Sequence, residues 1–335
     1  MTAANRPTLL HPRLDSPRAF RTAILSALGN APEAIEPGRM LRFSTNGKRG
    51  DLAGWCLLFV DGRAGIYGCH RTGLSAVWTA TERRLMSRAE NAELARQVQA
   101  ASDERKRLQA QSWAEQGPRN ARLWAHCSPV NDDGSGADPV TAYVRNRLVM
   151  PHEPLQIPQA LRLHAGLDYR HDGNLIGAWP AMVAAMVNPA GELVALHRTW
   201  ITTDGRKAAV PGPVKKLTSA SGTVAGGCVP LYAMKDGVLG IAEGIETAMA
   251  ARQASGLPTV AAYSAGALAA WQWPRGLRRL VIFADNDPAG TEAADKLRAR
   301  ALGARISVDV LAPSEAGLDW CDVWARRPQA TEVRA

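Results

Sequence analysis

The segments 238-VLGIAEG-244 and 280-LVIFADNDPAG-290 decide the fold of this chain. Each is a short apolar run that ends in acidic residues, Glu243 in the first and Asp285 and Asp287 in the second. A short apolar run followed by a helical pattern is typical of a buried strand in a parallel sheet. Because such strands deliver their carboxyl ends to one edge of the sheet, we expect the three acids to meet there.

The sequence around these two segments continues the same alternation. Strands are predicted at residues 239–242, 259–263, 280–284 and 305–311, and helices after residue 244, through 267–271, at 288–302 and near Trp320. Alternating strands and helices imply a parallel sheet that helices cover. The fold class predicted for residues 237–335 is therefore α/β.

The middle of the chain predicts an α+β region that follows a long helix. Residues 79–116 contain neither glycine nor proline, which predicts one long, solvated helix that ends at Gly117-Pro118. The glycine-rich residues 131–136 predict a flexible interruption, and 140–148 a further helix. Strands are expected between residues 161 and 232, with a hairpin that pairs 181–187 with 193–201. Residues 203–219 are expected to form a basic loop.

The beginning of the chain predicts a small β-rich module. A helix is expected from Ser16 to residue 28, and strands at 41–43, 55–60 and 64–67. The resulting division is 1–78 for this module, 79–137 for the long helix and linker, 138–236 for the α+β basic subdomain and 237–335 for the α/β domain.

Composition restricts the class of protein. The 335 residues are 46% hydrophobic and 21% charged, which is typical of globular domains, and the formal net charge of +9 favours a polyanionic partner such as nucleic acid. The five cysteines form no C-x-x-C pair, and no leader or membrane-length apolar segment is evident. We expect a cytoplasmic protein in a reducing compartment, without a membrane partner.

The clustered acids predict a metal site. Carboxylates brought together repel one another unless a cation neutralises them, and oxygen ligands suit Mg²⁺ or Mn²⁺. Asp319 and Asp322, after the last strand, either extend this site or cap the final helix. An oxygen-rich metal site on a basic protein indicates metal-assisted phosphoryl transfer.

Glu243-Gly244 after one strand and Asp285-x-Asp287-x-Ala289-Gly290 after a later one resemble the Toprim domain of primases, topoisomerases and some nucleases. The resemblance implies a metal-linked or general acid/base role for Glu243 and metal binding by Asp285 and Asp287. Upstream segments resemble those that precede Toprim in primase-like proteins of plasmids, phages and integrative elements. These upstream segments are residues 180–183, 197–200, 204–208 and 215–217, and residues from Arg42 to Trp78 show further similarity to the same group.

The chain departs from the bacterial replicative primase in lacking a four-ligand zinc ribbon. Cys56, Cys69 and His70 have no fourth ligand at a standard spacing, so no zinc is expected and the cysteines are interpreted as buried. The chain also has no phosphate-binding Gly-x-x-x-x-Gly-Lys-Ser/Thr loop, so a helicase would be a separate chain.

The leading hypothesis is a DNA primase, a nucleotidyltransferase of DNA replication that makes short primers on single-stranded DNA from nucleoside triphosphates. Template or triphosphate would contact a group of basic residues: His197, Arg198, Arg206, Lys207, Lys215 and Lys216. Two alternatives stay open, a Toprim metal-dependent nuclease and a non-catalytic accessory protein that binds single-stranded DNA.

Overall fold

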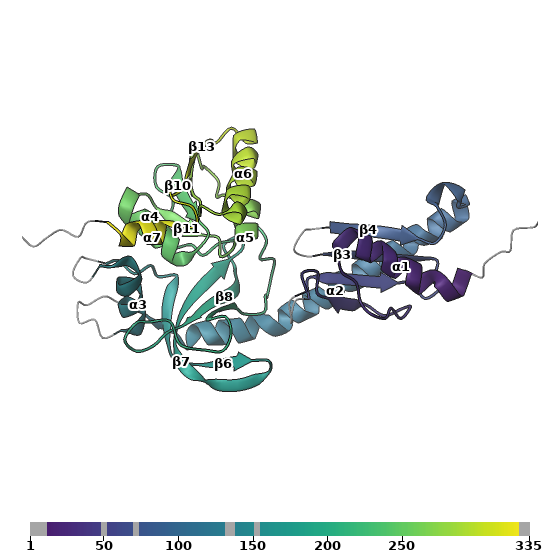
Figure 1. The fold of residues 1–335 in the computed structure, drawn as a ribbon, viewed down its shortest axis with the longest axis horizontal. Helices are drawn as coiled ribbons and strands as arrows, with labels where there is room; N and C mark the ends of the chain where they lie inside the picture. The colour runs from purple at the N-terminus through teal and green to yellow at the C-terminus, as the bar shows by residue number, and fades with distance from the viewer. Residues whose placement is uncertain (1–11, 48–51, 70–73, 131–137, 151–154, 328–335) are drawn as a thin grey trace, which may run out of the picture. The chain divides into compact units, whose positions relative to one another are not determined.

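The computed structural model describes residues 12–47, 52–69, 74–130, 138–150 and 155–327. Contacts divide the chain into two compact units, Met1–Gln109 and Ala110–Ala335, and helix α2 (Arg88–Ala125) supplies residues to both (Figure 1). The finer division into four segments remains a prediction. The expected interruption at 131–136 and His70 lie outside the described residues.

The first unit is an antiparallel sheet between two helices. Its elements are α1 (Pro12–Leu28), β1 (Leu41–Phe43), β2 (Gly54–Leu58), β3 (Ala64–Cys69), β4 (Leu74–Thr79), the 3₁₀ turn η1 (Arg83–Leu85) and the first part of α2. The strands are hydrogen-bonded in the order β1-β2-β3-β4. Phe20 and Ile24 of α1 pack on one face, and Leu94 and Val98 of α2 pack on the other. The β-rich module predicted from sequence is confirmed.

Neighbouring residues of β2 point to opposite faces of this sheet. Trp55 packs under α2, whereas Cys56 lies in the core beneath α1. Cys69 is also buried, with its Sγ 3.5 Å from the hydroxyl of Thr45. The interpretation of both cysteines as buried is therefore confirmed.

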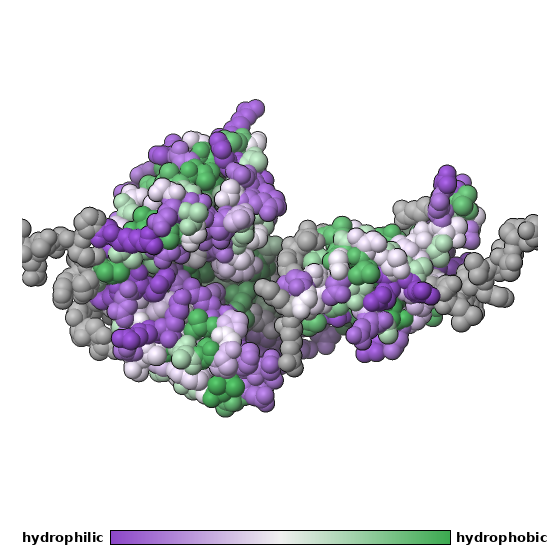
Figure 2. Space-filling view, viewed as in Figure 1, coloured by the Kyte–Doolittle hydropathy of each residue, from purple (hydrophilic) through white to green (hydrophobic). Residues whose placement is uncertain are grey.

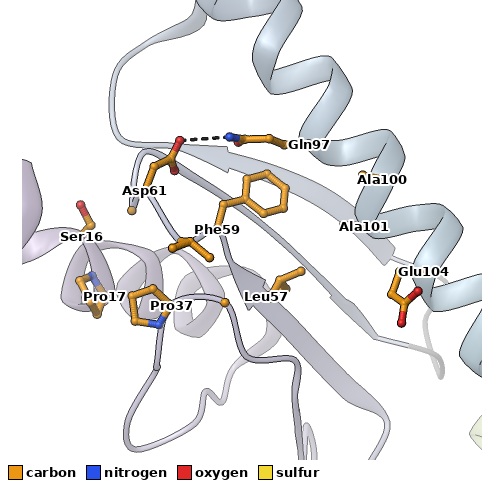
Figure 3. Close-up of a pocket in the computed structure, with 13 residues that line it drawn as sticks. Ser16, Pro17, Pro37, Leu57, Phe59, Asp61, Gln97, Ala100, Ala101 and Glu104 are labelled. Carbon is orange, nitrogen blue, oxygen red and sulfur yellow. Dashed lines mark hydrogen bonds between the residues drawn. The ribbon is translucent and has the colours of Figure 1, made fainter.

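A groove of about 860 Å³ runs along α2 within this first unit (Figure 3). Leu57 and Phe59 form its floor, and Ala101 lies on its α2 side. The Gln97 amide donates a hydrogen bond of 3.1 Å to Asp61 at one end of the groove (Figure 3). This hydrogen bond and the packing of Leu94 on the sheet show that part of α2 contacts the sheet, whereas a mostly solvated helix was expected.

Helix α2 differs from its prediction at both ends. It begins at Arg88 because β4 extends to Thr79 and because Ser87 and Glu90 cap each other, with Oγ accepting from the Glu90 amide at 3.2 Å and the Glu90 carboxylate accepting from the Ser87 amide at 2.8 Å. The prediction that Gly117-Pro118 ends the helix is wrong.

Packing beyond the proline explains why the helix continues. Pro118 removes one helical hydrogen bond, which is normally destabilising. Downstream, Leu123 and Trp124 pack against a buried aromatic cluster, and the Asn120 amide donates to the Ser219 carbonyl at 3.1 Å. Tertiary contacts therefore outweigh the local helix-breaking signal.

The second unit contains a five-stranded antiparallel sheet. Its strands, hydrogen-bonded in chain order, are β5 (Ser128–Pro129), β6 (Leu161–His171), β7 (Asn174–Val187), β8 (Leu193–Trp200) and β9 (Lys215–Leu217), and α3 (Pro139–Leu148) precedes β6. The predicted hairpin is confirmed by the β7–β8 pairing. The prediction that residues 203–219 are all loop is wrong, because residues 215–217 pair with 197–199 as an edge strand.

The same unit contains the parallel sheet predicted from sequence. Its elements are β10 (Val238–Ala242), α4 (Ile245–Ser255), β11 (Thr259–Ala261), α5 (Ala265–Ala270), β12 (Arg279–Phe283), α6 (Pro288–Gly303), β13 (Ser307–Leu311) and α7 (Trp320–Ala325). The strand order is β11-β10-β12-β13, and every pair is parallel. Helices α4 and α7 cover one face, and α5 and α6 the other (Figure 1). The predicted α/β class is confirmed.

One cluster of buried side chains joins the two sheets of the second unit. Met182 and Met186 of β7 pack in it together with Ile245 and Met249 of α4. On the outside, Figure 2 shows hydrophobic and hydrophilic residues interleaved, including at the β6–β7 hairpin, where Leu175 and Ile176 are exposed. Among the described residues no helix combines the length and apolar character of a membrane span.

Candidate active site

Two adjacent parallel strands bring the predicted acids to one edge of the sheet. β10 and β12 pair in register, with Ala242 opposite Phe283, so Glu243 and Asp285 both stand just beyond the carboxyl edge. Each side chain is half-buried there. We expected these two acids to meet because both follow strand ends, and the structure brings them within electrostatic range of each other.

Asp285 has the most unfavourable electrostatic position in this group. Burial first, and then the negative charges of Glu243, Asp319, Asp287 and Asp322, raise its pKa to about 7. Its Oδ1 is buried and accepts no hydrogen bond from any described residue. No donor offsets the cost of burying this oxygen. A cation bound here would both replace the missing hydrogen bond and neutralise the repulsion between Asp285 and the neighbouring carboxylates.

Glu243 experiences the same field more weakly. Burial raises its pKa, as does the charge of Asp287, while a hydrogen bond from the Ala265 amide opposes both effects. Asp287 itself is exposed at the N-terminus of α6, where its Oδ1 accepts from the Gly290 amide at 2.7 Å. The charge of Asp287 thus reaches both Glu243 and Asp285, and it raises the pKa of each.

Asp319 and Asp322 form a capping box at the start of α7. Asp319 accepts from the Asp322 amide at 2.8 Å, and Asp322 accepts from the Asp319 amide at 3.3 Å. The hydroxyl of Thr247 also lies 3.4 Å from Asp319 Oδ2. The predicted capping role is therefore present. The charges of Asp319 and Asp322 also raise the pKa of Asp285, so metal binding by this pair stays a prediction that is compatible with the cap.

Asn286, between the two aspartates, holds the loop that carries Asp319. Its side-chain amide donates to the Pro313 carbonyl at 2.8 Å, and its backbone pairs with Leu318 at 3.0 Å and Gly317 at 2.7 Å. These bonds bring the last loop against the end of β12. Sequence reasoning missed this role, although the position of Asn286 inside the acidic motif was a signal.

The donor chemistry of this group fits a hard divalent cation. All of its side-chain ligands are carboxylate oxygens, which Mg²⁺ and Mn²⁺ prefer, and the uncompensated Asp285 Oδ1 points to a missing positive charge. Within the described residues, no three His, Cys, Asp or Glu side chains are already arranged around a common ion position.

The predicted basic residues separate onto two faces of the antiparallel sheet. Thr199 pairs with Lys215 and Arg198 with Lys216, so Lys215 and Lys216 point in opposite directions. Lys215 faces α4, where its ammonium binds Glu246 at 2.7 Å. The two adjacent lysines therefore do not form one basic patch.

Lys216 and Arg198 make contacts within the protein. The Lys216 ammonium donates to the Arg170 carbonyl at 2.6 Å and lies 3.9 Å from the ring centroid of Tyr169. Arg198 donates to the Leu217 carbonyl at 3.0 Å, and its guanidinium lies 5.1 Å from the ring centroid of Trp200. Both cations thus have partners within the protein, although Arg198 Nε is buried and has no hydrogen-bond partner among the described residues, and their contact with nucleic acid or nucleotide remains a prediction.

The remaining basic residues differ in charge and exposure. Arg206 is exposed and pairs with Asp204 at 3.1 Å, while Lys207 is exposed close to Lys215. Burial lowers the pKa of His197 to about 4, so its ring is neutral at pH 7. Contacts to nucleic acid or nucleotide by these residues remain a prediction.

Three polar residues in this region were missed by sequence reasoning. Glu246, in the first turn of α4, accepts a hydrogen bond of 2.5 Å from the hydroxyl of Tyr143 and binds Lys215. Arg147 of α3 lies within electrostatic range of Glu246 and Asp319, and its Nε has no hydrogen-bond partner among the described residues. The position of Glu246, three residues after Glu243, was the available signal.

Comparison with known families agrees with this geometry. Residues 238–330 match the family model described as a Toprim domain, so the parallel sheet and its acidic edge constitute a Toprim domain. Residues 114–230 match a domain of unknown function, DUF7146. No curated protein matches the chain.

Solved structures similar to the chain include several primases. A DNA primase domain from Pseudomonas aeruginosa is 14% identical with a TM-score of 0.32, over 48% of this chain and 51% of that one. The primase fragment of the bacteriophage T7 primase-helicase protein is 13% identical with a TM-score of 0.34, over 59% and 74%. The Aquifex aeolicus primase, with its zinc binding and RNA polymerase domains, is 13% identical with a TM-score of 0.35, over 92% and 81%. The chain spans about half the length of the Pseudomonas structure.

Proposed function

We propose that this chain is a DNA primase-type nucleotidyltransferase that makes short primers on single-stranded DNA. The observation that supports the proposal best is the buried Asp285 oxygen without a partner at the edge of the Toprim sheet, within electrostatic range of Glu243 and Asp287. Such a group suits phosphoryl transfer, in which positioning and electrostatics do most of the work.

In this proposal each acid has a distinct role. Asp285 and Asp287 hold Mg²⁺ or Mn²⁺, with Asp319 and Asp322 as further candidate ligands. The bound ion would supply positive charge to the phosphate oxygens during transfer. Glu243, whose pKa is raised, is suited to accept the proton that the primer 3′ hydroxyl loses as it attacks the α-phosphorus. The bond from the α-phosphorus to the α,β-bridging oxygen breaks in the same step, and pyrophosphate leaves.

Basic residues of the antiparallel sheet would bind the anionic substrates. Lys215 and Lys207, with Arg147 nearby, lie on the side of the sheet that faces α3 and α4, and they are proposed to contact the nucleoside triphosphate. Exposed Arg206 is proposed to contact template phosphates. Arg198, Lys216 and neutral His197 are then supporting residues of the same sheet rather than direct ligands.

The cellular setting belongs to the same proposal. A cytoplasmic protein of a mobile genetic element, working with a helicase on a separate chain, would match the primase-like resemblance of the upstream segments.

Two other functions compete with this proposal. A Toprim nuclease would use the same acids to shorten DNA with metal and without nucleotides. A non-catalytic accessory protein would bind single-stranded DNA equally well with or without the Asp285 carboxylate.

The decisive experiment incubates the protein with single-stranded DNA, labelled ribonucleotides and Mg²⁺ or Mn²⁺, and compares the parent with Asp285→Ala. We expect labelled oligomers from the parent and a loss of at least about 100-fold in the variant, because an electrostatic group at the reaction centre is removed. DNA affinity should not fall in the variant. Metal-dependent shortening of the DNA instead would favour the nuclease, and absence of any product with either metal would contradict the proposal.

A further inference from the structure

Glu246 is the carboxylate that is buried most completely among the described residues. It is 6% exposed and lies in the first turn of α4, one helical turn after Glu243. Two elements of the antiparallel region reach it. Tyr143 of α3 donates to Oε1 at 2.5 Å, and Lys215 of β9 contacts Oε1 at 2.7 Å and Oε2 at 2.8 Å.

Stability alone is a weak reason for this arrangement. Burying an ion pair costs desolvation energy that its attraction only roughly offsets, and apolar residues often replace such a pair without loss. Although burial opposes ionisation of Glu246, Lys215 and Tyr143 lower its pKa, so the carboxylate is charged at neutral pH. What the pair achieves is a fixed position for the ammonium of an otherwise flexible side chain.

The fixed ammonium keeps the capacity to bind a ligand. A lysine has three N–H donors, and contacts to the two oxygens of Glu246 leave the third. The Lys215 side chain is 37% exposed, in contrast to its buried partner. The Lys215 ammonium is therefore held by the buried Glu246 carboxylate while its side chain remains accessible to solvent.

Other charges nearby define what this ammonium faces. Lys207 and Arg147 lie within electrostatic range of Glu246, and Arg147 is also within range of Asp319 in the acidic group. Lys215 alone contacts Glu246, and Lys207 and Arg147 add positive charge within electrostatic range of it. The excess of positive charge suits a phosphate group that is also bound at the acidic edge.

We propose that Glu246 is a positioning residue that, supported by Tyr143, holds the Lys215 ammonium beside the acidic group to bind the phosphates of the incoming nucleotide. The inference rests on the proposed function but can be tested without synthesis.

The test measures binding of a ribonucleoside triphosphate with Mg²⁺ and without template, together with kcat and KM for primer synthesis. In Glu246→Gln the Kd and KM for nucleotide should rise at least about 10-fold and kcat should change less than about 3-fold, because one anchored, charge-assisted contact is weakened. Tyr143→Phe, which keeps the ring, should raise both constants about 2- to 5-fold. A purely structural role would instead lower the melting temperature and the active fraction while Kd and KM stayed constant.

A double substitution shows whether Glu246 acts through Lys215. Glu246→Gln combined with Lys215→Ala should bind nucleotide no more weakly than Lys215→Ala alone, within about 2-fold, since residues that act as a unit are not additive. Asp309→Asn is the matched control, because it breaks the 2.8 Å Arg279–Asp309 pair elsewhere in the Toprim sheet and should leave Kd and KM unchanged. Independent, multiplying effects or an unchanged Kd in Glu246→Gln would overturn the inference. If the parent bound nucleotide in this Lys215-dependent way but made no primers, only the proposed function would fail.

Discussion

At the residue scale, Lys215 and Lys216 show how one step along a strand changes the role of a side chain. Their charges are equal and their positions adjacent, yet Lys215 contacts a buried carboxylate whereas Lys216 contacts a backbone carbonyl and an aromatic ring. The two side chains point to opposite faces because residues 215–217 form strand β9, where a loop was expected. A basic segment in the sequence therefore does not define a basic surface.

His197, on the neighbouring strand, gives a prediction about pH. Its pKa is about 4 in the folded protein, below the ~6.5 of an unperturbed histidine. The unfolded chain thus binds a proton more readily between these values, and folding stability must fall as pH drops through this range. The parent should lose about 1–2 kcal/mol more than His197→Gln between pH 7 and pH 5. Urea unfolding at both pH values measures the difference, and equal losses would show that His197 is not buried in its neutral form.

At the element scale, the start of α6 sets the position of the acidic motif. A Cβ on Gly290 would lie 2.6 Å from the carbonyl oxygen of Asp285. A side chain at position 290 would collide with this oxygen. Glycine is therefore what allows α6 to pack this closely against the end of β12.

Gly290→Ala should therefore displace the Asp285 loop. We expect a loss of about 1–3 kcal/mol in unfolding free energy from overpacking and, if synthesis is confirmed, a fall of more than about 10-fold in its rate. Gly303→Ala, at the other end of α6, is the control, because its Cβ would meet no atom within 4 Å. Thermal unfolding and the primer assay test both variants, and normal activity in Gly290→Ala would show that the loop tolerates the shift.

At the scale of the whole molecule, the candidate site belongs to one of the two compact units. The acidic edge, Lys215 and Glu246 all lie within Ala110–Ala335, which has a continuous core of its own. A fragment of residues 110–335 should therefore fold cooperatively and bind nucleotide with a Kd within about 3-fold of the full chain, because no described residue of the proposed nucleotide site is removed. Calorimetry and nucleotide titration measure this. A fragment that does not fold would show that the unit depends on residues 1–109.

The sequence by itself determined the Toprim sheet and the placement of its acids. Short apolar runs that end in Glu243 and in Asp285 specify buried parallel strands, and such strands meet at one edge whatever the rest of the chain does. For Asp319 and Asp322 the sequence left two roles open, a metal ligand or a helix cap, and the structure shows the capping box. Only the tertiary structure decided that α2 continues past Pro118, that residues 215–217 form a strand, and that Glu246 meets Tyr143 and Lys215. Each of these depends on contacts between residues far apart in the chain, whose burial and hydrogen bonding outweigh local preferences that point elsewhere.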